Sequence, residues 1–93
     1  MFEKNDVIFS GRMGICRVED ITKLVESNTK MVSYYVLRSL VDKRVAYIPV
    51  EDHEVLLREL ISKEEARRRI ESGEKLEEME KLEIQYVLED AVE

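Results

Sequence analysis

Two side chains in this sequence could take part in nucleophilic or acid–base chemistry, and each stands alone. His53 is the only histidine and lies between Asp52 and Glu54, a setting that suits a general base. No serine or cysteine is placed by sequence to be its nucleophile. Cys16, the only cysteine, alternates with Val18 in an apolar run, which indicates a small buried hydrophobic residue. We therefore expect a surface or structural role for His53, no catalytic residues and no enzymatic activity.

The composition favours neither a cofactor site nor a basic surface. Three glycines are too few for a phosphate-binding loop, and a metal would find only carboxylates as further ligands, so we expect no cofactor and no metal. The chain carries 21 acidic and 15 basic side chains and a net charge of −6. This balance excludes a protein that binds nucleic acid mainly by neutralising phosphates. A chain of 93 residues also has little room for a deep substrate cavity.

Arg67, Arg68 and Arg69 form a positive run and are the candidate DNA-binding residues. Consecutive residues of a helix point about 100° apart, so the three side chains do not make one patch. Each has a glutamate three or four residues away, for example Glu64 or Glu65, which is typical of ion pairs on a solvated helix. The sequence therefore favours ion pairs and supports DNA contact only weakly.

Three tyrosines mark a candidate protein-binding surface. Tyr34 and Tyr35 are neighbours in one expected strand, so they point to opposite faces, and Tyr47 lies in the next expected strand. At least one ring must then face outward, and tyrosine is enriched at protein interfaces. A small sheet with a free edge can also accept a strand of a partner through backbone hydrogen bonds, which depend little on side-chain identity.

The first part of the chain is expected to form a small β domain. Branched and aromatic residues in short runs predict five strands, at 6–9, 15–25, 31–40, 45–50 and 55–58. Gly11 and Gly14 supply a tight turn after the first strand, and residues 26–30 supply a hairpin loop. Pro49 has no amide donor and belongs at an edge or strand end. Short strands with tight turns predict a small closed or half-closed barrel of the SH3 or Tudor kind.

The second part, residues 61–93, is expected to be helical and carries a net charge of −5, against −1 for residues 1–60. Ser62 and Glu65 form a capping box for a helix that should end near residue 70 or 71, with Gly73 as a left-handed cap. A second helix is expected at 74–91. Its apolar residues lie on two faces, namely Leu76, Ile84, Val87, Leu88 and Ala91 on one and Met79, Leu82 and Tyr86 on the other.

One small barrel and one short helix are not expected to cover both of these faces. Either self-association through helix 74–91 covers the second face, or further helical residues follow in a longer protein.

Other features favour a cytoplasmic protein. A single cysteine excludes an internal disulfide, residues 1–6 lack the apolar core of a signal peptide, and the uncharged stretch 31–37 is too short to span a bilayer.

Five motifs in a fixed order resemble one family. They are NDVIF at 5–9, GRMG with ICRVEDI at 11–21, YVLR at 35–38, YIPVE at 47–51 and ISKEEA at 61–66. Together they resemble the CarD/CdnL family of bacterial transcription regulators and the RNA polymerase-interacting domain of the transcription-repair coupling factor, over about residues 1–70. The capped helix directly after the barrel is more similar to the CarD-like proteins.

The resemblance implies a Tudor-like domain at 1–60 that docks on the RNA polymerase β subunit by pairing a sheet edge with a strand of that subunit. Residues 61–93 would begin a truncated or reduced helical domain, which in full-length members contacts promoter DNA and stabilises the open complex. By motif position, the polymerase-binding residues are Lys23, Leu24, Val45, Tyr47 and Pro49.

The chain departs from the family pattern at several points. Asn5 stands where glycine is usual, a swap that asparagine tolerates, and some members have arginine where Tyr47 stands. The chain has no tryptophan to wedge into a minor groove, and its tail is acidic. We therefore expect a regulator of initiation that binds polymerase better than promoter DNA. The alternatives are a small SH3-like nucleic-acid-binding barrel and a homo-oligomeric interaction module.

Overall fold

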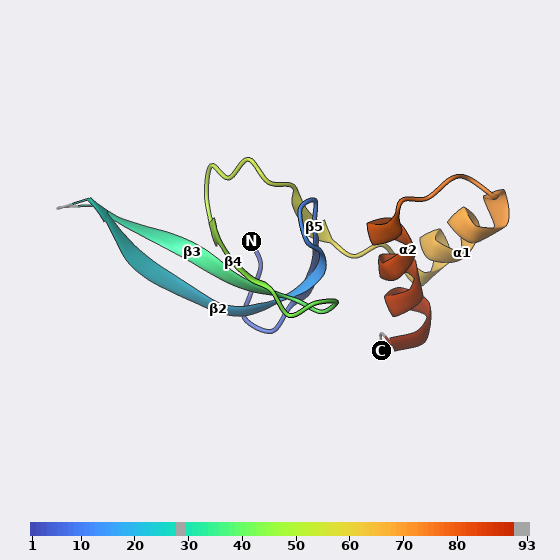
Figure 1. The fold of residues 1–93 in the computed structure, drawn as a ribbon, viewed down its shortest axis with the longest axis horizontal. Coiled ribbons are helices and arrows are strands. Elements are labelled where there is room, and N and C mark those ends of the chain that lie inside the picture. Colours follow the sequence, from blue (N-terminus) through green and yellow to red (C-terminus); the bar gives the residue numbers. More distant parts are fainter. Residues whose placement is uncertain (28–29, 91–93) are drawn as a thin grey trace.

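The computed structural model describes residues 1–27 and 30–90 and places a β-sheet beside a pair of helices (Figure 1). The molecule is elongated, with extents of 53 × 25 × 23 Å. The predicted class, mainly β with C-terminal α, is confirmed. The elements in chain order are β1 (Val7–Ser10), β2 (Gly14–Ser27), β3 (Lys30–Ser39), β4 (Val45–Pro49), β5 (Leu57–Glu59), α1 (Lys63–Ser72), α2 (Glu78–Gln85) and the π-helical turn η1 (Tyr86–Asp90).

The five strands form one antiparallel sheet in the order β4-β3-β2-β1-β5. The sheet is not closed, so the closed form of the expected barrel was wrong. Closure would require β5 to pair with β4, but β5 has only three residues before the chain leaves for the helices. β2 and β3, with 14 and 10 residues, are longer than the neighbouring strands. They form a hairpin that projects away from the helices (Figure 1). Residues 28–29 of the expected loop lie outside the described residues.

Two buried serines shape the turns at the end of the sheet that faces the helices. Ser10 Oγ accepts hydrogen bonds from the amides two and three residues later, at 3.1 and 3.3 Å, and Ser39 Oγ repeats this pattern at the same distances. Gly14 and Lys43 complete these turns with φ of 78° and 68°. Asn5 adopts φ of 79°, which confirms that it takes the left-handed conformation expected of glycine at that position.

The main core lies on one face of the sheet. Cys16, as predicted from its alternation with Val18, is fully buried there. Residues before β1 also cover this face, because the Phe2 amide donates to the hydroxyl of the buried Tyr35 at 3.1 Å and the two rings lie 5.8 Å apart. The buried members of this core are Ile8, Met13, Cys16, Val18, Tyr35, Leu37 and Ile48.

The first helix begins and ends close to where the sequence predicts. Ser62 Oγ accepts from the Glu65 amide at 3.0 Å, and Gly73 takes the left-handed cap with φ of 71°. A capping box also requires the Ser62 amide to donate to the Glu65 carboxylate, and this part of the prediction was wrong, because that carboxylate binds Arg68 and Arg69. The hydrogen bonds from these arginines, with that of Arg68 the larger cause, lower the pKa of the Glu65 carboxyl.

The second helix is shorter than expected. It starts at residue 78 because Glu77 is still extended, and the Glu80 carboxylate accepts from the Glu77 amide at 3.0 Å. At residue 86 the chain passes into the π-helical turn, and Ala91 lies outside the described residues.

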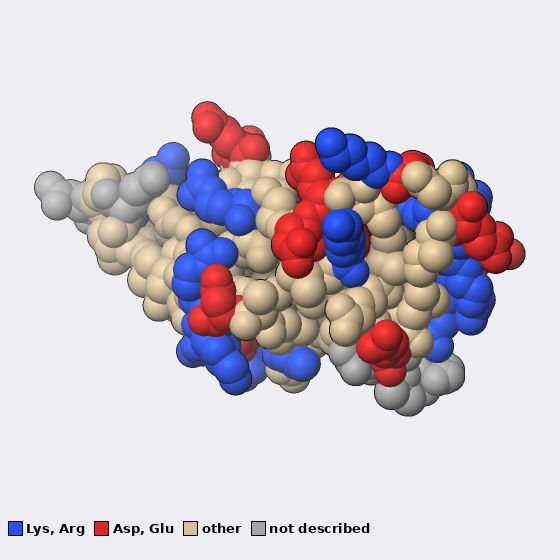
Figure 2. Space-filling model, turned by 45° about the vertical axis from the view of Figure 1, so that its right-hand side comes forward, with Lys and Arg blue, Asp and Glu red and all other residues tan. Residues whose placement is uncertain are grey.

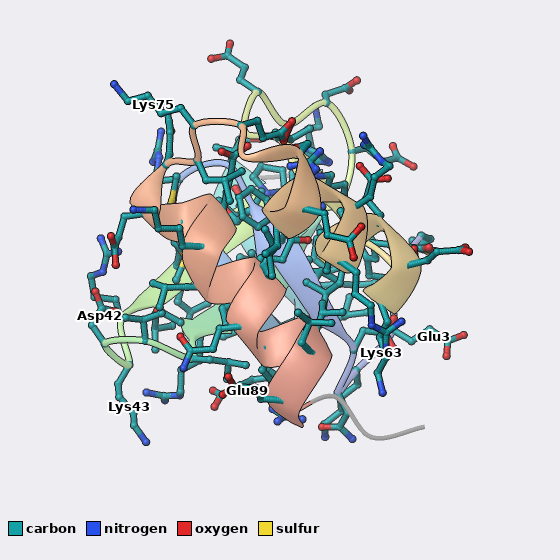
Figure 3. The ribbon with its side chains drawn as sticks, turned by 90° about the vertical axis from the view of Figure 1, so that its right-hand side faces the viewer. Glu3, Asp42, Lys43, Lys63, Lys75 and Glu89 are labelled. Carbon is teal, nitrogen blue, oxygen red and sulfur yellow. The ribbon has the colours of Figure 1, made fainter. Side chains whose placement is uncertain are left out.

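One apolar face of α2 and η1 is buried within this chain, and the other is half-buried. On one face, Ile84 and Val87 are buried against Ala66 of α1. On the other face, Met79 lies beside Gly14. Leu82 and Tyr86 line a hollow together with Ile15 of β2 and with Leu40 and Val41 of the β3–β4 turn. Figure 3 shows α2 crossing in front of the sheet, with the β3–β4 turn (Asp42 and Lys43) to one side and α1 to the other. The sheet therefore covers the second face only in part, and self-association through helix 74–91 stays a prediction.

A buried ion pair fixes the helices on the sheet. Glu83 of α2 has a side-chain exposure of 0%, and its two carboxylate oxygens accept from the Arg58 guanidinium at 2.8 and 2.9 Å. The Ile61 amide donates a third hydrogen bond at 3.0 Å. The guanidinium also lies over the Phe9 ring, 4.2 Å from its centroid. We call this cluster of Phe9, Arg58, Ile61 and Glu83 the Glu83 joint. It connects β1, β5, α2 and the segment 60–62 between β5 and α1.

Glu83→Ala is expected to lower the free energy of unfolding by about 3 kcal/mol, because it leaves the partly buried Arg58 without its partner. Glu19→Ala is the control, since it breaks the exposed Arg38–Glu19 pair and is expected to cost less than about 1 kcal/mol. Urea unfolding of both variants measures the difference. Equal losses of stability would show that the Glu83 joint does not hold the helices in place.

Candidate functional site

The β4 strand forms an open edge of the sheet. β4 pairs with β3 on one side, in a register that sets Val36 opposite Tyr47 and Tyr34 opposite Pro49. Within residues 1–27 and 30–90, no strand pairs with its other side. The opposite edge, β5, is only three residues long, and its Arg58 is engaged in the Glu83 joint. β4 is therefore the edge of the sheet that is better suited to accept another strand.

The hydrogen-bond pattern shows which backbone groups of β4 face outward. The Ser39 amide donates to the Arg44 carbonyl, and the Val50 amide donates to the Ser33 carbonyl. Backbone groups of an antiparallel strand alternate between its two sides, so even-numbered residues from 44 to 50 point toward β3. Val45 and Tyr47 consequently direct both N–H and C=O outward. Pro49 follows the same alternation but offers only its carbonyl.

The side chains of the same residues share one face of the sheet. Val45 is 43% exposed and Tyr47 is 54% exposed, whereas Ile48, between Tyr47 and Pro49, is buried in the core. The face that carries Tyr47 continues across β3 through Val36 and Tyr34, which are half-buried. The β4 edge thus combines free backbone donors and acceptors with an apolar and aromatic surface.

The structure separates the two candidate residues on β2. Leu24 pairs with Val32, so it lies on the same face as Tyr47, but β3 stands between its strand and β4. Lys23 pairs with Ser33 and lies on the opposite face. The structure therefore brings Val45, Tyr47 and Pro49 together on one surface. Leu24 lies on the same surface but farther away, and Lys23 does not belong to it.

Charged side chains of both signs cover the helical end of the molecule. Figure 2 shows acidic and basic side chains interleaved over the helices and further, mostly basic, side chains over the sheet half. On α1, Arg68 pairs with Glu65, and Arg69 lies 3.1 Å from Glu65, 3.8 Å from Glu74 and 3.6 Å from Glu80. The predicted ion pairs are thus present for Arg68 and Arg69. Arg67 is exposed, and no ion pair is found for it among the described residues.

His53 and Cys16, the two side chains considered for catalysis, each have a structural role in the fold. His53 Nδ1 lies 2.8 Å from the Val55 carbonyl, which is the geometry of a hydrogen bond that holds the loop before β5. Cys16 is buried in the sheet core. In the part of the chain that the structure describes, no three His, Cys, Asp or Glu side chains gather as metal ligands would. Likewise, no helix of that part is long and apolar enough to cross a membrane.

Comparison with family models matches residues 2–61 to the CarD-like/TRCF RID domain. The chain belongs to the CarD-like/TRCF RID domain family. The resemblance seen in the five motifs is confirmed, and the chain carries an RNA polymerase-interacting domain, which is a protein-interaction module rather than a known catalytic family. Comparisons with curated proteins and with solved structures gave no match.

The CarD-like match ends at the joint between sheet and helices. Its last residue, Ile61, is the one whose amide donates to Glu83. Sequence inspection missed Glu83, because its partner lies 25 positions away and it resembles the exposed glutamates around it. Its position between Leu82 and Ile84, inside an apolar stretch of the helix, is the feature that could have marked it.

Cys16 should behave as a core residue and not as a nucleophile. Burial raises the pKa of its thiol from 9.0 to about 11. At pH 8 the thiolate fraction is then about 100-fold lower than in the unfolded chain, where the ordinary value applies. A thiol reagent should therefore modify the native protein at least about 100-fold more slowly than the urea-unfolded protein. Equal rates in the two states would contradict the buried position.

Proposed function

We propose that this chain is a non-enzymatic transcription regulator that binds the β subunit of RNA polymerase through the open edge of β4 and modulates initiation. The family supplies the partner class, since the chain carries an RNA polymerase-interacting domain. The observation that supports the place of binding is the outward pair of N–H and C=O groups on Val45 and on Tyr47. A strand of the β subunit would extend the sheet there.

In this proposal the contact depends on backbone and side chains in different ways. Backbone pairing along Val45 and Tyr47 supplies hydrogen bonds that any extended strand can make. The exposed Tyr47 ring and the Val45 side chain then favour an apolar residue on the docking strand, because side chains of paired strands contact each other across the ladder. Leu24 would contribute from the same face, and Lys23, on the other face, would contribute least.

The helical part, residues 61–93, is proposed as the beginning of a DNA-proximal domain, held at a fixed position by the Glu83 joint. Arg67 is the best placed of the three arginines for a phosphate, since Arg68 and Arg69 are already paired with glutamates. The net charge of −5 in this segment opposes strong DNA binding. The chain would therefore act in the cytoplasm on polymerase first and on promoter DNA weakly.

Two substitutions on β4 test the docking edge by titration against the isolated β-subunit lobe. Tyr47→Ala should weaken binding about tenfold, because it truncates an exposed aromatic side chain in the centre of the contact. Val45→Pro should weaken it at least about tenfold, because proline removes an outward N–H while leaving the β3–β4 bonds intact.

Ile70→Ala is the matched control, since Ile70 is an exposed apolar residue of α1, the helix that follows β5 at the opposite edge of the sheet. Its affinity should equal that of the unmodified chain, and circular dichroism should show that all three variants are folded. Unchanged affinity of both Tyr47→Ala and Val45→Pro would mean that β4 is not the docking edge.

A further inference from the structure

The β2 strand forms a second open edge, on the side of the projecting hairpin opposite to β4 (Figure 1). β1 accompanies β2 only as far as Arg17. The last contacts on this side are two hydrogen bonds between the Val18 backbone and residues 5 and 6. From residue 19 to residue 27, no strand pairs with this side of β2 among the described residues. The sheet therefore has unpaired backbone along β2 as well as along β4.

Three residues of β2 direct their backbone groups to this open side. The Ser33 carbonyl accepts from the Val50 amide at 2.9 Å, so the backbone groups of Ser33 face the β4 side. The register partner of Ser33 on β2 is Lys23, whose backbone groups must then point away from β3. Ile21 and Val25 follow by alternation. These three residues make up the open β2 edge.

The side chains of the open β2 edge share one face of the hairpin and are exposed. Ile21 is 38% exposed and Val25 is 67% exposed, and the exposed Lys23 lies between them. The Ile21 amide donates to the Asp20 carboxylate at 2.8 Å, so its donor is engaged by a local side chain and not by a strand. Without Lys23 the edge would present only β-branched side chains beside free backbone groups, and such edges promote pairing between chains.

We infer that Lys23 prevents two copies of this chain from pairing through their β2 edges. Two identical edges that meet about a two-fold axis pair antiparallel, and their contacts are reciprocal. Pairing that uses all three outward residues sets Ile21 opposite Val25 of the second copy and sets the two Lys23 side chains opposite each other. Directly opposed residues have Cβ atoms about 5 Å apart, and like charges in that position destabilise the pair.

The β4 edge lacks such a charge. Its outward residues are Val45, Tyr47 and Pro49, none of which is ionisable near neutral pH except at the unreactive extreme of tyrosine. A lysine in the middle of an exposed strand is a common protection against edge pairing. Lys23 thus keeps the β2 edge unpaired, while β4 stays able to accept a strand. This role of Lys23 requires no polymerase, so it is tested on the chain alone and can fail while the proposed function stands.

Analytical ultracentrifugation of a set of variants measures the effect of the Lys23 charge. Lys23→Val should dimerise at least about tenfold more tightly than the unmodified chain, because an apolar cross-strand pair replaces two opposed charges. Lys23→Thr removes the charge without adding a large apolar group and should change association in the same direction. Lys23→Glu should associate no more than the unmodified chain, because it again sets like charges opposite each other.

Lys75→Val is the matched control, since it makes the same change at an exposed lysine between α1 and α2. Its association should equal that of the unmodified chain, and circular dichroism should show that all variants are folded. Hydrogen exchange then locates the contact. The amides at positions 23 and 25 should exchange quickly in the unmodified chain and become protected in the Lys23→Val dimer, which separates β2 pairing from self-association through β4 or through helix 74–91.

Dimerisation of Lys23→Val with protection at positions 23 and 25, and without dimerisation of Lys23→Glu or Lys75→Val, supports the role of Lys23. Three results would overturn it. Lys23→Val and Lys23→Thr could associate no more tightly than the unmodified chain over the same concentration range. Lys23→Glu could dimerise as strongly as Lys23→Val, which would show that charge is not the cause. The unmodified chain could itself show protection at positions 23 and 25, which would mean that its β2 edges pair in spite of Lys23.

Discussion

The pairing of Glu83 with Arg58 is the interaction on which the arrangement of this molecule depends. A carboxylate without solvent contact is tolerated only if its charge and its hydrogen-bonding capacity are satisfied. Glu83 achieves this with two hydrogen bonds from Arg58 and one from the Ile61 amide, and these groups meet only when α2 lies against β5. The helices are therefore fixed at the turn end of the sheet (Figure 1). The β4 edge and the hairpin are left uncovered as a consequence.

Local patterns predicted much of the fold. Alternation of apolar residues and the turn glycines placed the five strands, and Ser62 with Gly73 placed the first helix, because each of these features acts within a few residues of its effect. The start of α2 was missed because two glutamates, Glu77 and Glu80, cap it in a segment where nearly every residue has high helix propensity. No local pattern predicts that the sheet stays open, because this depends on where the chain goes after β5.

The candidate site was predictable to a similar extent. Val45, Tyr47 and Pro49 come together because they alternate along one strand, and that alternation is visible in the sequence. The same rule separates Lys23 from Leu24, since neighbours in a strand cannot share a face. Which edge of the sheet remains free could not be deduced, because it follows from the strand order and from the position of the helices.

The central claim is that β4 binds polymerase through its outward backbone groups, and residue-resolved hydrogen exchange tests it most directly. The Ile48 amide faces β3 and should exchange slowly in the free chain and in the complex alike. The Val45 and Tyr47 amides face outward, so they should exchange quickly in the free chain and become strongly protected when the β-subunit lobe is bound. Formation of the complex without added protection of Val45 and Tyr47 would contradict the account.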